Sequence, residues 1–241
     1  MAYLADGKDE AIAREGYRMK AMLKVFLASA MLLTVSAVQA GGGSYPIPLD
    51  KAKISVLDQA SLQRGADLYA QYCMGCHSMK YLRVNRAARD LGWTPEEGVA
   101  HFQHIRNGQG KPTDMVETTL NPATAKLAFG NVPPDLSLEA RLRGTDWIYT
   151  FLRSYERAED GSVNNKLFPG VAMPHILEGL QNSLPPAEFD AAVGDLVNFM
   201  DYAAEPAKPQ RLMMGWWVLG FLALLIVLTY LLKKEFWRDV K

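Results

Sequence analysis

Two apolar runs lie near the two ends of the chain, and the first extends from Val25 to Val38. Three basic residues precede it: Arg18, Lys20 and Lys24. A basic segment, a short apolar core and small residues up to Ala40 predict a secretory signal peptide over residues 1–40, cleaved after Ala40. A run of about fourteen residues is short for the alternative, a transmembrane helix. Either Met1 or Met19 fits as the start of the peptide.

The second run, Leu212 to Leu232, has no charged residue and is long enough to span a bilayer. Tryptophans suited to the membrane interfaces lie at its two ends: Trp216, Trp217 and Trp237. Lysines directly after the run indicate a cytoplasmic C-terminus. The pattern predicts, in order, a periplasmic domain over 41–204, a linker over 205–210, a transmembrane anchor over 211–234 and a cytoplasmic tail over 235–241. Such a chain would cross the bacterial inner membrane once.

Between the two runs, the pattern predicts helices joined by long loops, a mainly α fold. Asp58 caps the first helix, whose buried face continues at steps of four and three through Cys73 and Cys76. A capping box, Thr94-Pro95-Glu96-Glu97, opens a second helix that runs to about Asn107. Further helices are expected from Pro133, from Asp146 and from Pro185, with irregular segments over 108–130 and 157–172. The last helix carries an apolar stripe of Phe189, Val193, Leu196, Val197 and Met200.

Length and charge narrow the class of protein. The 241 residues suffice for one sizeable domain with appendages, and the formal net charge of the chain is zero. Residues 41–204 alone hold 15 basic and 19 acidic residues, a net charge of −4. A mildly acidic domain favours basic protein partners and disfavours nucleic acid.

The motif with the clearest chemistry is Cys73-Met74-Gly75-Cys76-His77. Two thiols three residues apart lie on one face of a helical turn, where both can add to the vinyl groups of one haem. The following His77 is then placed to ligate the iron, so the pattern predicts covalent attachment of one haem c. A zinc site is excluded because the chain has no further paired ligands for it. A redox dithiol would follow a strand in a βαβ unit, and the pattern indicates no such unit. The chain is therefore interpreted as a c-type cytochrome.

The second axial ligand decides the redox chemistry, because methionine raises the haem potential and favours electron transfer. Nine of the eleven methionines are excluded as ligands. Six lie in the targeting segment or at the membrane anchor, two lie too near His77, and Met200 lies on a helical stripe. Met115 and Met173 remain. Met173 lies in Phe168-Pro169-Gly170-Val171-Ala172-Met173-Pro174, the methionine strap, where prolines hold the backbone extended. A stiff segment lowers the entropy lost when a weak thioether binds, which favours Met173. His175 is the rival ligand and would lower the potential.

Haem propionates need cations or hydrogen-bond donors, and the planar guanidinium of arginine suits carboxylates. Arg141 and Arg143 follow the Pro133-Pro134 loop and are the candidates. The alternative for both is a solvated basic face.

These pieces together resemble the cytochrome c1 family, the haem subunits of the cytochrome bc1 complex (ubiquinol–cytochrome c oxidoreductase). The matching blocks cover about residues 45 to 240 and include the attachment motif and the single C-terminal span. Two further blocks are more specific: Pro133-Pro134-Asp135-Leu136-Ser137 followed by Arg141-Leu142-Arg143-Gly144, and Ala172-Met173-Pro174-His175. A shorter segment after Gly144 fits a bacterial member.

The resemblance implies a cytochrome c-like haem domain in which His77 and Met173 are the axial ligands. It also implies that Arg143 holds a haem propionate, and we add Arg141 and Pro134 to the cofactor-binding residues. The implied role is a one-electron relay from the Rieske iron–sulfur protein to a soluble or membrane-bound cytochrome c, beside cytochrome b in a dimeric complex. The chain alone would make and break no substrate bond.

Two other functions remain open at this point. A free-standing, membrane-anchored cytochrome c that delivers electrons to a terminal oxidase would purify without a b-type cytochrome. A haem peroxidase or gas sensor would have an open iron and bind carbon monoxide readily when reduced.

Overall fold

The computed structural model describes residues 45–102 and 109–239, so the predicted signal peptide lies outside the described residues. The described part is mainly helical, as predicted, and one cluster of buried apolar side chains forms its core. Its elements are, in chain order, α2 (Gln59–Leu68), η1 (Tyr69–Cys73), β1 (Met79–Arg83), α3 (Val84–Leu91), α4 (Pro95–His101), β2 (Met115–Val116), α5 (Pro122–Phe129), α6 (Glu139–Leu142), α7 (Thr145–Arg153), β3 (Tyr155–Arg157), β4 (Val163–Asn165), α8 (Glu178–Ser183), α9 (Pro186–Ala204) and α10 (Lys208–Phe236).

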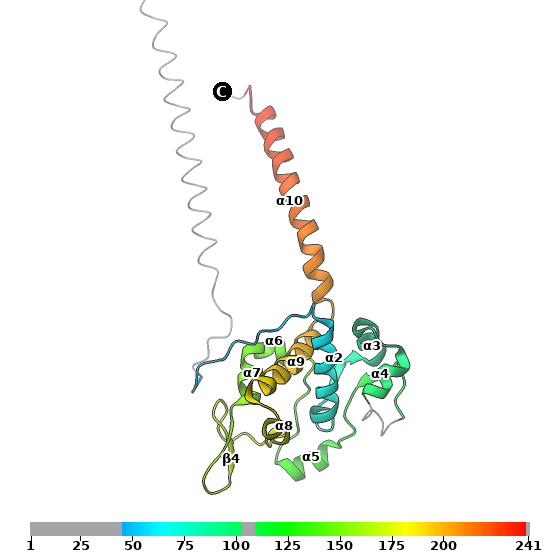
Figure 1. The fold of residues 1–241 in the computed structure, drawn as a ribbon. Coiled ribbons are helices and arrows are strands. Elements are labelled where there is room, and N and C mark those ends of the chain that lie inside the picture. Colours follow the sequence, from blue (N-terminus) through cyan, green and yellow to red (C-terminus); the bar gives the residue numbers. More distant parts are fainter. Residues whose placement is uncertain (1–44, 103–108, 240–241) are drawn as a thin grey trace, which may run out of the picture. The chain divides into compact units, whose positions relative to one another are not determined.

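Helix α9 lies at the centre of the haem domain, packed against α2, α6 and α7 (Figure 1). It begins at Pro186, directly after Pro185, as the sequence predicted. All five residues of its predicted apolar stripe are buried. Burial of this stripe against α2 fixes the helix that leads into the cysteine motif.

Local capping signals set the start of two helices. The Asp58 side chain accepts a hydrogen bond from the Ser61 amide at 3.1 Å and begins α2. Thr94 and Glu97 form the complete capping box at the start of α4, which confirms both predicted starts. Helix α4 ends at His101, however, because the Phe102 backbone leaves the helical region, and residues 103–108 lie outside the described part.

Two segments expected to be irregular contain regular structure. Helix α5 lies within 108–130, where the Asn121 side chain accepts from the Ala123 amide at 2.8 Å and Gly130, at φ +73°, ends the helix. Ala125 is its only buried residue. A helix that buries so little needs no apolar stripe, and hydrophobic periodicity therefore did not indicate α5. Strand β4 lies within 157–172. It pairs antiparallel with β3, which overlaps that segment only at Arg157, and Tyr155 lies opposite Asn165.

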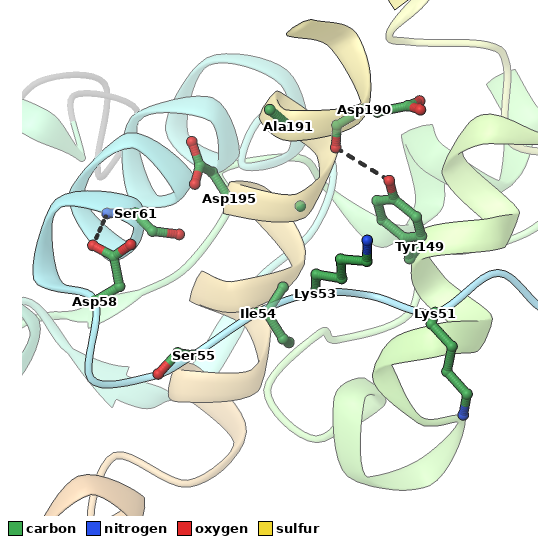
Figure 2. A pocket seen from close by; sticks show the side chains of 11 residues that line it. Lys51, Lys53, Ile54, Ser55, Asp58, Ser61, Tyr149, Asp190, Ala191 and Asp195 are labelled. Atoms are coloured by element: carbon green, nitrogen blue, oxygen red, sulfur yellow. Dashed lines mark hydrogen bonds between the residues drawn. The ribbon is translucent and has the colours of Figure 1, made fainter. Parts of the chain in front are cut away.

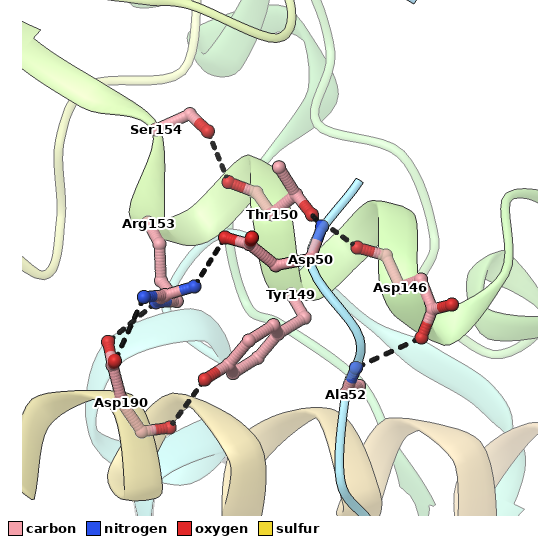
Figure 3. Close-up of polar contacts among 8 residues, drawn as sticks. All are labelled: Asp50, Ala52, Asp146, Tyr149, Thr150, Arg153, Ser154 and Asp190. Atoms are coloured by element: carbon pink, nitrogen blue, oxygen red, sulfur yellow. Dashed lines mark hydrogen bonds and ion pairs between the residues drawn. The ribbon is translucent and has the colours of Figure 1, made fainter. Parts of the chain in front are cut away.

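Asp146 does not cap α7, because its carboxylate binds the segment that precedes α2, residues 45–57 (the lead-in). That helix begins at Thr145 after Gly144, and the Asp146 carboxylate instead accepts from the Ala52 amide at 3.0 Å (Figure 3). Arg153 binds both Asp50 and Asp190 of α9, each at 2.6 Å. These contacts tie the lead-in to α7 and α9. The helix expected from Pro133 likewise begins only at Glu139, as α6.

Helix α10 is the one helix in the described part of the chain that is long and apolar enough to cross a membrane. It runs from Lys208 to Phe236, with a mean hydropathy of 2.3 in its most apolar window and no buried residue. Its last turn carries Lys233 and Lys234, next to the predicted cytoplasmic tail. A helix of this kind fits a membrane-anchored protein.

Candidate haem site

The two cysteines occupy the end of helix α2 and the tight turn after it. Helix α2 continues into a single π-helical turn, η1, closed by a hydrogen bond from the Met74 amide to the Tyr69 carbonyl at 2.9 Å. The amides of Cys76 and His77 both donate to the Cys73 carbonyl, at 3.0 and 2.9 Å. This arrangement places three reactive side chains within five residues on one compact turn.

Both cysteines are free thiols in different surroundings. Cys73 is buried and Cys76 is half-buried. Burial, and secondarily the neighbouring Cys76, raises the pKa of the Cys73 thiol to about 12. The environment therefore favours an uncharged sulfur at Cys73, which is the state of a thioether.

One ring nitrogen of His77 forms a hydrogen bond, and the other has no hydrogen-bond partner among the residues that the structure describes. Its Nδ1 lies 2.7 Å from the Pro134 carbonyl oxygen, so Nδ1 carries the proton and Nε2 keeps its lone pair. Burial lowers the pKa of His77, which favours the neutral ring that can ligate a metal. The Tyr69 hydroxyl also donates to the His77 carbonyl at 2.7 Å. The contact with Pro134 orients the imidazole, and the bond from Tyr69 holds the His77 main chain.

The loop that contains Pro134 is itself tied to the chain that follows His77. The Leu136 amide donates to the Ser78 carbonyl at 2.8 Å, and the Lys80 amide donates to the Asp135 carboxylate at 3.0 Å. Pro134 thus takes part in the site through its main-chain carbonyl. The position of this carbonyl depends on the block Pro133-Pro134-Asp135-Leu136-Ser137, which carries part of the family resemblance.

The two candidate arginines lie in different surroundings. Arg143 follows α6, where its Nε donates to Glu139 at 2.9 Å and its guanidinium carbon lies 4.4 Å from the Trp147 ring centroid. Arg141 instead forms an ion pair with Glu205 at 3.6 Å, at the start of the linker to α10.

Met173 lies half-buried on the methionine strap and packs against the core cluster. Its carbonyl accepts a hydrogen bond from the Tyr155 hydroxyl at 3.0 Å. The other two candidate ligands are held elsewhere. Met115 lies in β2, opposite Arg83 of β1. The Nε2 of His175 lies 2.7 Å from Gln181 Oε1, and its ring stacks on Tyr155.

The donor set fits a c-type haem. Two free thiols precede a neutral imidazole whose Nε2 forms no hydrogen bond with the described residues, and a thioether lies on a separate, stiff segment. Imidazole and thioether are the axial pair of electron-transfer cytochromes. The open groove drawn in Figure 2 is a different feature, because Lys53, Tyr149 and Gly194 are among its lining residues and none of the residues predicted to bind the cofactor is.

Sequence reasoning missed three residues that organise the site. Tyr155 and Tyr69 lie outside the sequence motifs that indicate a haem, although their hydroxyls donate to the carbonyls of Met173 and His77. Asn165 was not singled out, although it is buried and its side chain makes three hydrogen bonds. A single tyrosine or asparagine outside a motif is a weak signal, because its partners here are main-chain groups, which residue types do not reveal.

The fold and these groups define a c-type cytochrome with a C-terminal membrane anchor. The model of the Cytochrome C1 family matches residues 50–240, and the chain belongs to that family. Among curated proteins, it is 41% identical to cytochrome c1 of Allochromatium vinosum over 91% of this chain and 100% of the relative. It is 40% identical to the ammonia monooxygenase gamma subunit of Nitrosomonas europaea, over 89% and 97%. It is 33% identical to a mitochondrial cytochrome c1 haem protein of Arabidopsis thaliana, over 78% and 70%.

Family membership settles the coarse function predicted from the sequence. The chain is a haem protein with c-type haem as its cofactor, and it carries electrons as a subunit of the cytochrome bc1 complex. The free-standing cytochrome considered above is not favoured.

Proposed function

We propose that this chain holds one haem c between His77 and Met173, and that it relays single electrons from the Rieske iron–sulfur protein to a cytochrome c. The observation that carries the proposal is the 2.7 Å contact between His77 Nδ1 and the Pro134 carbonyl, which leaves Nε2 available as a donor. The stiff methionine strap supports Met173 as the second ligand. The Met115 main chain is committed to β2 and the His175 ring to Gln181.

Each proposed cofactor residue has a distinct part. Cys73 and Cys76 would form the thioether links, and Arg143 would donate to a propionate. Arg141 could join it only if its ion pair with Glu205 were shared or broken. When bound, the haem supplies a one-electron iron couple whose potential a thioether ligand raises. The chain itself supplies neutral donors on pre-organised segments, which keeps structural change between oxidation states small.

We further propose that residues 1–40 are removed as a signal peptide, that 41–204 form the periplasmic domain, and that 211–234 cross the inner membrane. The linker 205–210 and the tail 235–241 complete this topology. The lysines at the end of α10 support a cytoplasmic C-terminus. Alkaline phosphatase fused after Ala204 should be active, and the same enzyme fused after the C-terminus should be inactive. The mature protein should begin at Gly41.

The partners we propose are cytochrome b and the Rieske protein within a dimeric complex, and a basic cytochrome c as the electron acceptor. The net charge of −4 over 41–204 supports attraction of a basic acceptor, and such attraction weakens with salt. The second-order rate of cytochrome c reduction should therefore fall as ionic strength rises. A rate that stays constant or rises with salt would contradict a basic acceptor.

Purification in a mild detergent tests the relay role. The chain should copurify with a b-type cytochrome and an iron–sulfur protein, and the preparation should reduce cytochrome c with quinol. A His77→Ala variant should lose this activity, whereas an exchange at exposed Asn131 should keep it. A chain that purifies alone would support a free-standing carrier, and rapid carbon monoxide binding by the reduced form would support an open-iron function.

A further inference from the structure

Tyr155 connects the end of α7 to the methionine strap. It opens strand β3 and is 7% exposed. Its hydroxyl donates to the Met173 carbonyl at 3.0 Å, across 18 residues of sequence. This hydrogen bond reaches the main chain of the residue whose side chain is the proposed ligand.

The Tyr155 ring is held on two sides. Phe151 of α7 meets it edge-on, with ring centroids 5.6 Å apart and an interplanar angle of 70°. His175 stacks on it almost in parallel, at 4.7 Å and 2°. His175 is in turn bound to Gln181 of α8 through Nε2 at 2.7 Å. The phenol therefore has little freedom to turn away from the strap.

A second set of contacts holds the first half of the strap. Asn165 Oδ1 accepts from the amides of Leu167 and Phe168, each at 3.0 Å, while its Nδ2 donates to the Phe151 carbonyl at 2.8 Å. The Gly170 amide donates to Asn164 Oδ1 at 3.0 Å. In the second half, the bond from Tyr155 and the turn after Pro174 hold the main chain, while the Val171 and Met173 side chains pack against the core.

We infer that Tyr155, with His175 stacked on it, is a positioning residue that holds the Met173 main chain where its thioether can ligate the haem iron. The inference rests on the proposed ligand role of Met173. A thioether is a weak ligand that external bases can displace, so its occupancy depends on how much freedom the strap gains when it is released. The phenol restricts that freedom without touching the iron.

The test measures, by optical titration, the affinity of imidazole for the ferric haem of the full-length chain. Tyr155→Phe removes the hydroxyl and keeps both ring contacts. It should increase imidazole affinity about five- to tenfold, as expected for the loss of one hydrogen bond that favours the ligated state. It should also weaken the sulfur-to-iron charge-transfer band of the ferric form. His175→Ala, which removes the stacked ring, should shift both readings in the same direction.

The matched control is Tyr149→Phe. Tyr149 also donates its phenol to a main-chain carbonyl, that of Asp190 at 3.4 Å, but does so between α7 and α9 (Figures 2 and 3). This variant should keep the wild-type imidazole affinity and charge-transfer band. Wild-type affinity in both Tyr155→Phe and His175→Ala would overturn the inference.

A fourth variant separates this inference from the proposed ligand itself. Met173→Leu should abolish the charge-transfer band and give the tightest imidazole binding of the set. If Met173→Leu leaves both readings unchanged, the proposed ligand is wrong. If it changes them and the Tyr155 and His175 variants do not, only the positioning role is wrong.

Discussion

Gly65 of α2 faces the main-chain carbonyl of Asp195 in α9 at a distance that no side chain could tolerate. A Cβ placed on Gly65 would lie 2.0 Å from the Asp195 oxygen and 2.8 Å from the Cβ of Phe199. The two helices therefore pack backbone against backbone. Because α2 leads directly into the Cys73 turn, this close approach fixes where the haem-binding turn sits on the core.

Replacing Gly65 by alanine should force α2 and α9 apart. We expect the free energy of unfolding to fall by about 3 kcal/mol, because the clashing atom belongs to a main chain that cannot rotate away. Thermal unfolding of the purified full-length chain measures the loss.

Gly194 of α9 provides the control for that substitution. Apart from the neighbouring backbone of its own helix, no atom of the described residues lies within 4 Å of a Cβ built there, and the residue lines the open groove of Figure 2. Gly194→Ala should leave stability unchanged or raise it by about 0.5–1 kcal/mol, since alanine is the better helix former. Equal effects of the two alanines would show that the α2–α9 contact is looser than described.

Asn165→Leu should destabilise the strap and the hairpin together. The exchange leaves three main-chain groups without their partner: those of Phe151 and Leu167, whose bonds are buried, and that of Phe168, whose bond is part-buried. A loss of about 2–4 kcal/mol in unfolding free energy is expected. Asn131→Ala, at an exposed site, should change stability by less than about 0.5 kcal/mol. A similarly small effect at Asn165 would mean that these hydrogen bonds do not organise the strap.

The junction between α9 and α10 should loosen in acid. The hydrogen bond from Arg211 holds the pKa of Glu205 below its ordinary value of 4.5. A depressed pKa means that this contact contributes stability above pH 4.5, and that the contribution is lost as the pH falls through the lower, folded-state value. The hydrogen-exchange protection factors of amides near residue 205, calculated against the intrinsic exchange rate at each pH, should therefore fall below pH 4.5.

A Glu205→Gln variant should exchange faster at neutral pH and show little of this acid step. Glu188→Gln, at an exposed position in α9, should behave like the wild type. An acid step that persists in Glu205→Gln would assign the loosening to a different group.

Sequence alone predicted the parts of this protein that depend on local signals. The Asp58 cap, the capping box at Thr94, the α9 stripe and the apolar span each involve residues a few positions apart, where spacing determines the contact. Helix α5 also had local signals, in Asn121-Pro122 and Gly130, but its exposed face gave no periodicity.

The parts that sequence could not predict depend on contacts between distant residues. His77 meets the Pro134 carbonyl 57 residues away, and Arg141 meets Glu205 across 64. A main-chain carbonyl leaves no trace in the residue type that carries it. Spacing therefore indicated which residue types could bind a haem, whereas the tautomer of His77 and the supports of the strap required the fold.

The two remaining methionine candidates offer the most direct test of the central claim, that His77 and Met173 are the axial ligands. Redox titration and the ferric charge-transfer band should be compared in Met173→Leu and Met115→Leu. Loss of the Met173 thioether should abolish the band and lower the potential by on the order of 100 mV, within the range of about 0.8 V that axial ligands span. Met115→Leu should match the wild type. A Met173→Leu protein with the wild-type band and potential, or a Met115→Leu protein that loses them, would contradict the ligand assignment.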